Sequence, residues 1–93
     1  MNKLSKEKQK ELIEDLEDWK LEDNPDRIVK EMEFDNFKES MEFVNRLAEL
    51  AEEKGHHPDI YISYNIVILE IMTHDIGGLT EDDFSLAKEI NKL

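Results

Sequence analysis

The chain has 93 residues, a length that predicts one small domain over 1–93 with a modest hydrophobic core. Charged residues make up 39% of it, and 24 acidic side chains outnumber 12 basic ones to give a net charge of −12. This charge argues against phosphate contacts with nucleic acid and against binding to anionic membrane surfaces. The lack of cysteine excludes a disulfide scaffold, a thiol nucleophile and a thiolate metal site.

The sequence also bears on where the protein works. Residues 1–10 are polar and charged, so no secretory signal is expected there. The longest apolar run, 66–69, is too short to span a bilayer. A reducing, cytoplasmic location is therefore the expectation.

The first part of the chain predicts a helix followed by a loose β-hairpin. The helix covers about 5–18, with Ser5 as its N-cap. Its narrow apolar stripe consists of Leu12, Ile13 and Leu16. Alternating apolar and polar residues then predict strands at 19–22 and 28–34, joined by the turn cluster 23–26.

A long second helix follows, capped by Asp35 or Asn36 and ended by Gly55. Apolar residues recur along it at steps of three and four: Phe37, Met41, Val44, Ala48 and Ala51, with Phe43, Leu47 and Leu50 widening the stripe. This periodicity makes it the best-defined helix in the sequence.

Two further strands are predicted at 60–64 and 66–73, with the turn at Asn65. The second strand is apolar on both faces: Val67, Leu69 and Ile71 on one, and Ile66, Ile68 and Met72 on the other, interrupted by Glu70. Solvated antiparallel sheets normally keep one polar face, so this pattern predicts subunit contacts.

The last helix begins after a turn at Gly77 and Gly78, with Thr80 as N-cap and Asp83 completing an approximate capping box. Its apolar side consists of Phe84, Leu86, Ala87, Ile90 and Leu93. The element order is then α-β-β-α-β-β-α. This order predicts an α+β two-layer sandwich, in which a four-stranded antiparallel sheet carries the helices on one face.

The three histidines lie at the ends of predicted elements, where functional side chains gather. His56 and His57 follow the second helix and His74 ends the last strand, so packing of that helix over the hairpin would bring them to one pocket. They could be partners for the negative end of the helix dipole. With Asp59 or Asp75 they could form a metal site, although adjacent histidines rarely direct both rings at one ion. The third interpretation is acid/base catalysis, because imidazole titrates nearest neutrality.

A spaced pattern resembles the signature of the pterin-4a-carbinolamine dehydratases: Glu52-x₃-His56-His57-Pro58-x₅-Tyr64-x₉-His74-x₈-Asp83. The run THDIGGLTEDDFSLAK at 73–88 is similar to the same family, as is the upstream spacing of Trp19, Phe34-Asp35-x-Phe37 and 48–53. The resemblance covers roughly 5–93. A seven-point pattern with fixed gaps is much more specific than a pair of adjacent histidines, so it favours the catalytic interpretation.

The resemblance implies a fold with the element order given above, in dimers whose sheets join edge to edge and often in tetramers. It implies loss of water from a 4a-hydroxytetrahydropterin such as 4a-hydroxytetrahydrobiopterin, giving a quinonoid dihydropterin. This reaction recycles the pterin after aromatic amino-acid hydroxylation and belongs to tetrahydrobiopterin metabolism. It requires no metal and no organic cofactor.

The resemblance also assigns site residues. Proton handling would belong to His56, His57 and His74; we expect His56 and His74 to exchange protons with substrate and His57 to position the ring. The residues expected to contact or support the pterin are Glu52, Pro58, Ile60, Thr73, Asp75 and Ile76. Among these, Glu52 would orient an imidazole. Ile60 stands where animal members carry a Trp, so it would supply an apolar wall without stacking.

Two other functions stay open. Some family members look like pterin-binding or chaperone-like modules that keep the fold but do not catalyse the dehydration. The departure at Ile60 motivates this alternative. In animals the family also binds the dimerisation helix of a transcription factor. The apolar stripe of the second helix could serve a homotypic or foreign helix in the same way.

Overall fold

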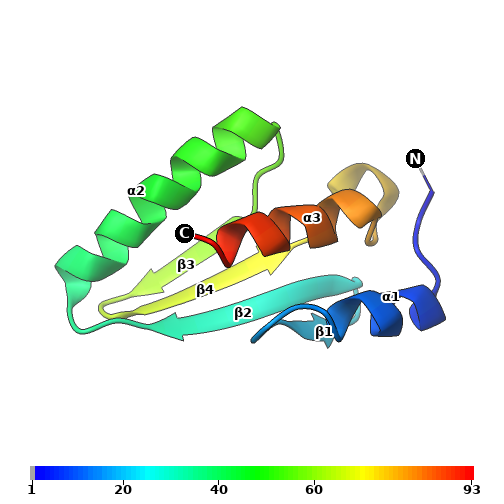
Figure 1. Ribbon diagram of the computed structural model, residues 1–93, viewed down its shortest axis with the longest axis horizontal. Coiled ribbons are helices and arrows are strands. Elements are labelled where there is room, and N and C mark those ends of the chain that lie inside the picture. The colour runs from blue at the N-terminus through cyan, green and yellow to red at the C-terminus, as the bar shows by residue number, and fades with distance from the viewer. Residues whose placement is uncertain (1) are drawn as a thin grey trace.

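The computed structural model describes residues 2–93, which form three α-helices and a four-stranded antiparallel sheet (Figure 1). Along the chain the elements are α1 (Lys6–Ile13), β1 (Lys20–Glu22), β2 (Arg27–Glu33), α2 (Phe37–Lys54), β3 (Asp59–Ser63), β4 (Ile66–Ile71), the 3₁₀ turn η1 (His74–Ile76) and α3 (Glu81–Ile90). The predicted fold class and element order are confirmed.

The strands lie in the order β1-β2-β4-β3, so β4 is central and β3 is an edge strand. Strand β4 pairs with both long neighbours: Leu69 lies opposite Ile60 of β3 and Lys30 of β2. Alternate residues of β4, namely Val67, Leu69 and Ile71, are fully buried under the helices. The helices therefore cover one face of the sheet, with α3 lying between α1 and α2 in Figure 1.

The other face of the sheet is less apolar than the sequence predicted. Ile66 and Ile68 are only half-buried there. Their partners on β2 are Glu33 and Glu31, so acidic side chains run beside them. The third apolar residue expected on this face, Met72, is instead in the core, because β4 ends at Ile71 and the alternation stops there.

Helix α2 buries only part of its predicted apolar stripe. Phe43, Leu47 and Ala51 are buried together with Ser40, while Ala48 is exposed and Phe37 is 49% exposed. Because the helix is apolar over a wide arc, periodicity alone did not select the buried part. The side chains of α2 that enter the core are those on the arc facing the sheet and α3.

The N-terminal helix is shorter than predicted. It ends at Ile13, not near Asp18, and Asp18 has a left-handed backbone with φ 67°. The residues after it still reach the core: Leu16 and Trp19 are buried in the connection to β1. These apolar side chains are therefore buried from the non-helical connection between α1 and β1.

Smaller differences from the prediction concern the ends of strand β3 and helix α3. Strand β3 begins at Asp59 and the turn uses Tyr64, with φ 51°, as well as Asn65. Leu93 lies beyond the end of α3 and is exposed, so it is not part of the apolar side of that helix.

Among residues 2–93, no helix is long and apolar enough to cross a membrane.

Candidate active site

The adjacent histidines His56 and His57 are positioned by the C-terminal end of α2. Gly55 caps the helix in the left-handed conformation, with φ 64°, a backbone that glycine adopts without steric cost. Its N–H donates to the Ala51 and Glu52 carbonyl oxygens, and the N–H of His56 donates to the Ala51 oxygen at 3.2 Å. The chain thus turns sharply away from the helix axis, and His56 and His57 lie at the turn.

His74 is held by a short closed loop after β4. The Thr73 N–H donates to the Gly78 carbonyl oxygen at 2.8 Å, and the Gly78 N–H donates back to the Thr73 oxygen at 3.4 Å. The loop between them is the 3₁₀ turn η1, which ends at Gly77 with φ 61°. His74 therefore projects from a backbone loop that is closed at its base.

These two segments line one hollow. The hollow has a volume of about 230 Å³, and its lining residues are Gly55, His56, His57, Met72, Thr73, His74 and Asp75. A second hollow of about 380 Å³ shares Gly55, His56 and Thr73 with the first and extends along α3 over Asp82, Ser85, Leu86 and Glu89, with Lys54 at its edge. All three histidines of the chain thus line the smaller hollow.

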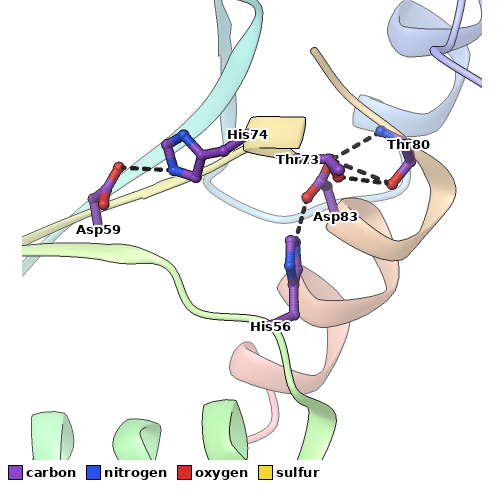
Figure 2. Close-up of polar contacts among 6 residues, drawn as sticks. All are labelled: His56, Asp59, Thr73, His74, Thr80 and Asp83. Carbon is purple, nitrogen blue, oxygen red and sulfur yellow. Dashed lines mark hydrogen bonds and ion pairs between the residues drawn. The ribbon is translucent and has the colours of Figure 1, made fainter. Parts of the chain in front are cut away.

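Each histidine is paired with a different carboxylate. His56 Nε2 lies 2.5 Å from Asp83 Oδ1, and His57 Nε2 contacts Glu52 Oε2. His74 Nε2 lies 3.8 Å from Asp59 Oδ2, beyond hydrogen-bond distance (Figure 2). The imidazoles therefore have separate acidic partners around the hollow, and His56 and His57 are hydrogen-bonded to theirs.

The three pairs differ in exposure. The side chain of Asp83 is fully buried and that of His56 is 23% exposed. The side chains of His57 and His74 are 61% and 66% exposed. A hydrogen bond to a charged group is stronger where water is excluded, so the His56 orientation is the most firmly fixed.

Asp83 is the functional residue that the site prediction missed. It was assigned to the capping box of the last helix, and the structure confirms that role: the Thr80 N–H donates to Asp83 Oδ2 at 2.8 Å. The same Oδ2 accepts the Thr73 hydroxyl at 3.0 Å, and Oδ1 is directed at His56 (Figure 2). The signal in the sequence was its place as the last member of the seven-point pattern.

The predicted binding residues fall into two groups. Thr73 and Asp75 line the histidine hollow, and Glu52 reaches it through His57. The other three predicted residues are not among its lining residues: Pro58, Ile60 and Ile76. Pro58 is buried, and Ile60 is half-buried against the hydrophobic core.

The metal interpretation finds no support in the geometry. Over residues 2–93, no group of three or more His, Cys, Asp or Glu side chains gathers around a common point that could hold an ion. The pairing of each imidazole with its own carboxylate spreads the possible ligands apart. The arrangement suits proton transfer, with His56 and His57 each oriented by one acidic partner and His74 exposed beside them.

Comparison with known proteins identifies the family of the chain. The family model described as pterin 4 alpha carbinolamine dehydratase matches residues 2–93. A candidate pterin-4-alpha-carbinolamine dehydratase from Sulfolobus acidocaldarius is 45% identical over 91 residues, covering 98% of each chain. A crystal structure described as a transcriptional coactivator/pterin dehydratase from Brucella melitensis is 30% identical, with a TM-score of 0.92 and coverage of 98% of this chain and 97% of the other.

A more distant solved structure shares the fold. It is described as a pterin dehydratase-like protein that is a RuBisCO assembly factor in the alpha-carboxysome. It is 22% identical, with a TM-score of 0.70 over 82% of this chain and 88% of the other, and supports the fold only. On the full-length family match and the 45% identity to a relative, the chain belongs to the pterin 4 alpha carbinolamine dehydratase family.

Proposed function

We propose that this protein catalyses the loss of water from a 4a-hydroxytetrahydropterin, giving a quinonoid dihydropterin. The observation that carries the proposal is the meeting of three imidazoles, each beside its own carboxylate, around one hollow. Imidazole can both donate and accept a proton near neutral pH, and dehydration needs one proton donated and one removed. Family membership supports a pterin as the substrate class.

The reaction balances without an oxidant or a metal. A protonated imidazole donates a proton to the hydroxyl on C4a, and the C4a–O bond breaks to release water. The lone pair of the neighbouring ring nitrogen, N5, forms a C=N double bond as the hydroxyl leaves. A neutral imidazole then removes the N5 proton, so the pair of histidines ends with the same total number of protons.

The surroundings of the rings favour His56 and His74 as the proton-exchanging pair. His56 Nε2 is held by Asp83, and among residues 2–93 no hydrogen bond holds the other ring nitrogen, Nδ1. His74 is exposed and only loosely associated with Asp59, so it can approach a substrate. His57, with its exposed partner Glu52, is then left to position the ring and its hydroxyl.

The test is rapid-mixing absorbance of 4a-hydroxytetrahydropterin decay with wild type, His56→Ala, His57→Ala and His74→Ala. We expect His56→Ala and His74→Ala each to lower turnover by roughly 10²–10⁴, the range for a general acid or base, and His57→Ala to act mainly on KM. The matched control is Lys38→Ala, at the exposed start of α2. It lies about 25 Å along the helix from His56 at 1.5 Å per residue.

Two results would contradict the proposal. An unchanged rate in His74→Ala would remove that histidine from the reaction. Tight pterin binding by a wild type that does not exceed the spontaneous rate would point to the alternative, a binding or assembly module of the same fold. We further propose a homodimer or homotetramer, which analytical ultracentrifugation would test, and a role in recycling tetrahydropterin in the cytoplasm.

A further inference from the structure

The hydroxyl group of Thr73 is used inside the protein. Its Oγ1 lies 3.0 Å from Asp83 Oδ2 and 3.1 Å from Thr80 Oγ1 (Figure 2). A hydroxyl has one proton to donate, and a carboxylate only accepts. Thr73 lies closer to Asp83 Oδ2 than Thr80 Oγ1 does, 3.0 Å against 3.5 Å, which assigns the Thr73 proton to Asp83 and leaves Thr80 to donate its own proton to Thr73.

These donors fix the Asp83 carboxylate. Oδ2 receives the Thr80 N–H at 2.8 Å and the Thr73 hydroxyl at 3.0 Å, from two segments on either side of the η1 loop. With Oδ2 held from two directions, Oδ1 stays directed at His56 Nε2, 2.5 Å away. The ring proton is then kept on Nε2, and Nδ1 keeps the lone pair that can take a proton.

Thr73 also lies at the base of the loop that carries the second proton-exchanging histidine. Its backbone is paired with Gly78 in both directions, and His74 is the next residue. Thr73 thus acts on both histidines: its hydroxyl contacts the carboxylate that holds His56, and its backbone closes the loop that carries His74. The lining of both hollows by Thr73 places it between them.

We propose that Thr73 is a positioning residue that fixes the tautomer and orientation of His56 through Asp83. This inference rests on the proposed dehydratase function and deepens it. It assigns the Thr73 hydroxyl to the protein, whereas the family resemblance placed Thr73 among the groups that hold the pterin.

The expected effect is moderate because the structure contains a partial substitute. Thr80 Oγ1 lies 3.5 Å from the same Asp83 Oδ2 and can move in when the Thr73 hydroxyl is lost. We therefore expect Thr73→Val to lower kcat by about 10-fold, the lower end of what loss of an outer hydrogen-bond partner costs. KM should change by less than about twofold, since the hydroxyl does not bind substrate.

The test combines turnover with ¹⁵N NMR of the His56 ring in wild type, Thr73→Val and Thr73→Ser. The inference expects Thr73→Val to lower kcat and to move the His56 Nε2 and Nδ1 shifts toward the other tautomer, and Thr73→Ser to restore both. Urea denaturation checks folding, and Thr73→Ala replaces Thr73→Val in both measurements if the valine variant does not fold.

Three results would overturn the inference. They are an unchanged kcat in Thr73→Val, a rise in KM that accounts for the whole loss, or unchanged His56 ring shifts. If wild type does not accelerate the reaction, the proposed function fails on its own, and the NMR comparison still decides whether Thr73 positions His56.

Discussion

Replacing Asp83 by Asn tests the support of His56 with almost no change in shape. Asp83 is fully buried and accepts from Thr80, Thr73 and His56. An Asn oxygen can keep the first two hydrogen bonds, which hold the start of α3. Its NH₂ group then faces His56 Nε2, which must become the acceptor, so the ring proton moves to Nδ1.

This geometry sets the size of two effects. A catalytic histidine held in the wrong tautomer loses about 10²–10⁴ in kcat, by analogy with other acid/base sites. Hydrogen bonds to a charged group contribute about 1.5–3 kcal/mol and neutral ones about 1 kcal/mol. Since Asp83→Asn replaces the charged partner of the buried His56 contact by a neutral one, we expect the weakening of this contact to lower the free energy of unfolding by about 0.5–2 kcal/mol.

The assay is stopped-flow turnover and urea denaturation of Asp83→Asn beside Glu81→Gln. Glu81 lies in the same first turn of α3 and is exposed, so its variant loses one charge without touching His56. We expect near wild-type turnover in Glu81→Gln. A kcat in Asp83→Asn within about threefold of wild type, in a folded protein, would refute the role of Asp83 in orienting His56.

Three further predictions concern stability and are measured by urea denaturation. Phe43→Ala should cost about 3–5 kcal/mol because the ring is buried, whereas the half-exposed Phe37→Ala should cost less than about 1 kcal/mol; equal losses would contradict the observed face of α2. Hydrogen bonding, led by that from Lys6, holds the pKa of Asp26 below its ordinary 3.8, so this carboxylate stabilises the fold above that pH. Asp26→Asn should therefore cost about 0.2–1 kcal/mol at pH 7, and the difference should shrink as the pH falls below 3.8; a constant difference would refute it. Gly55→Ala should cost about 1–2 kcal/mol because Gly55 has φ 64°, and Gly55→Asn should cost less; the reverse order would exclude backbone strain as the cause.

The fold was largely predictable because its signals are local. Turn residues and the change from helical to strand periodicity predicted all three α-helices and all four strands in their order, but not the 3₁₀ turn η1. What local patterns could not give was the buried arc of α2, since Phe37 and Phe43 both lie at helical spacing and only the neighbouring elements select between them. Burial of Ser40 has no hydrophobic signal at all. The early end of α1 at Ile13 is marked by no proline or glycine, so no local signal placed it there.

The candidate site was predictable in its histidines and less so in their partners. His56, His57 and His74 follow elements whose ends were visible in the sequence. The pairing of His56 with Asp83 depends on where the end of α2 lies relative to the start of α3, a tertiary relation. The capping role of Asp83 was enough to explain its presence, so its second contact drew no separate prediction.

The most direct test of the central claim compares positioned imidazoles with free ones. The rate of 4a-hydroxytetrahydropterin decay is measured with increasing substrate in the presence of wild-type protein, and again with three equivalents of free imidazole at the same pH. The account predicts a saturable rate with the protein that far exceeds the rate with free imidazole. Decay no faster with the protein than with free imidazole would contradict it.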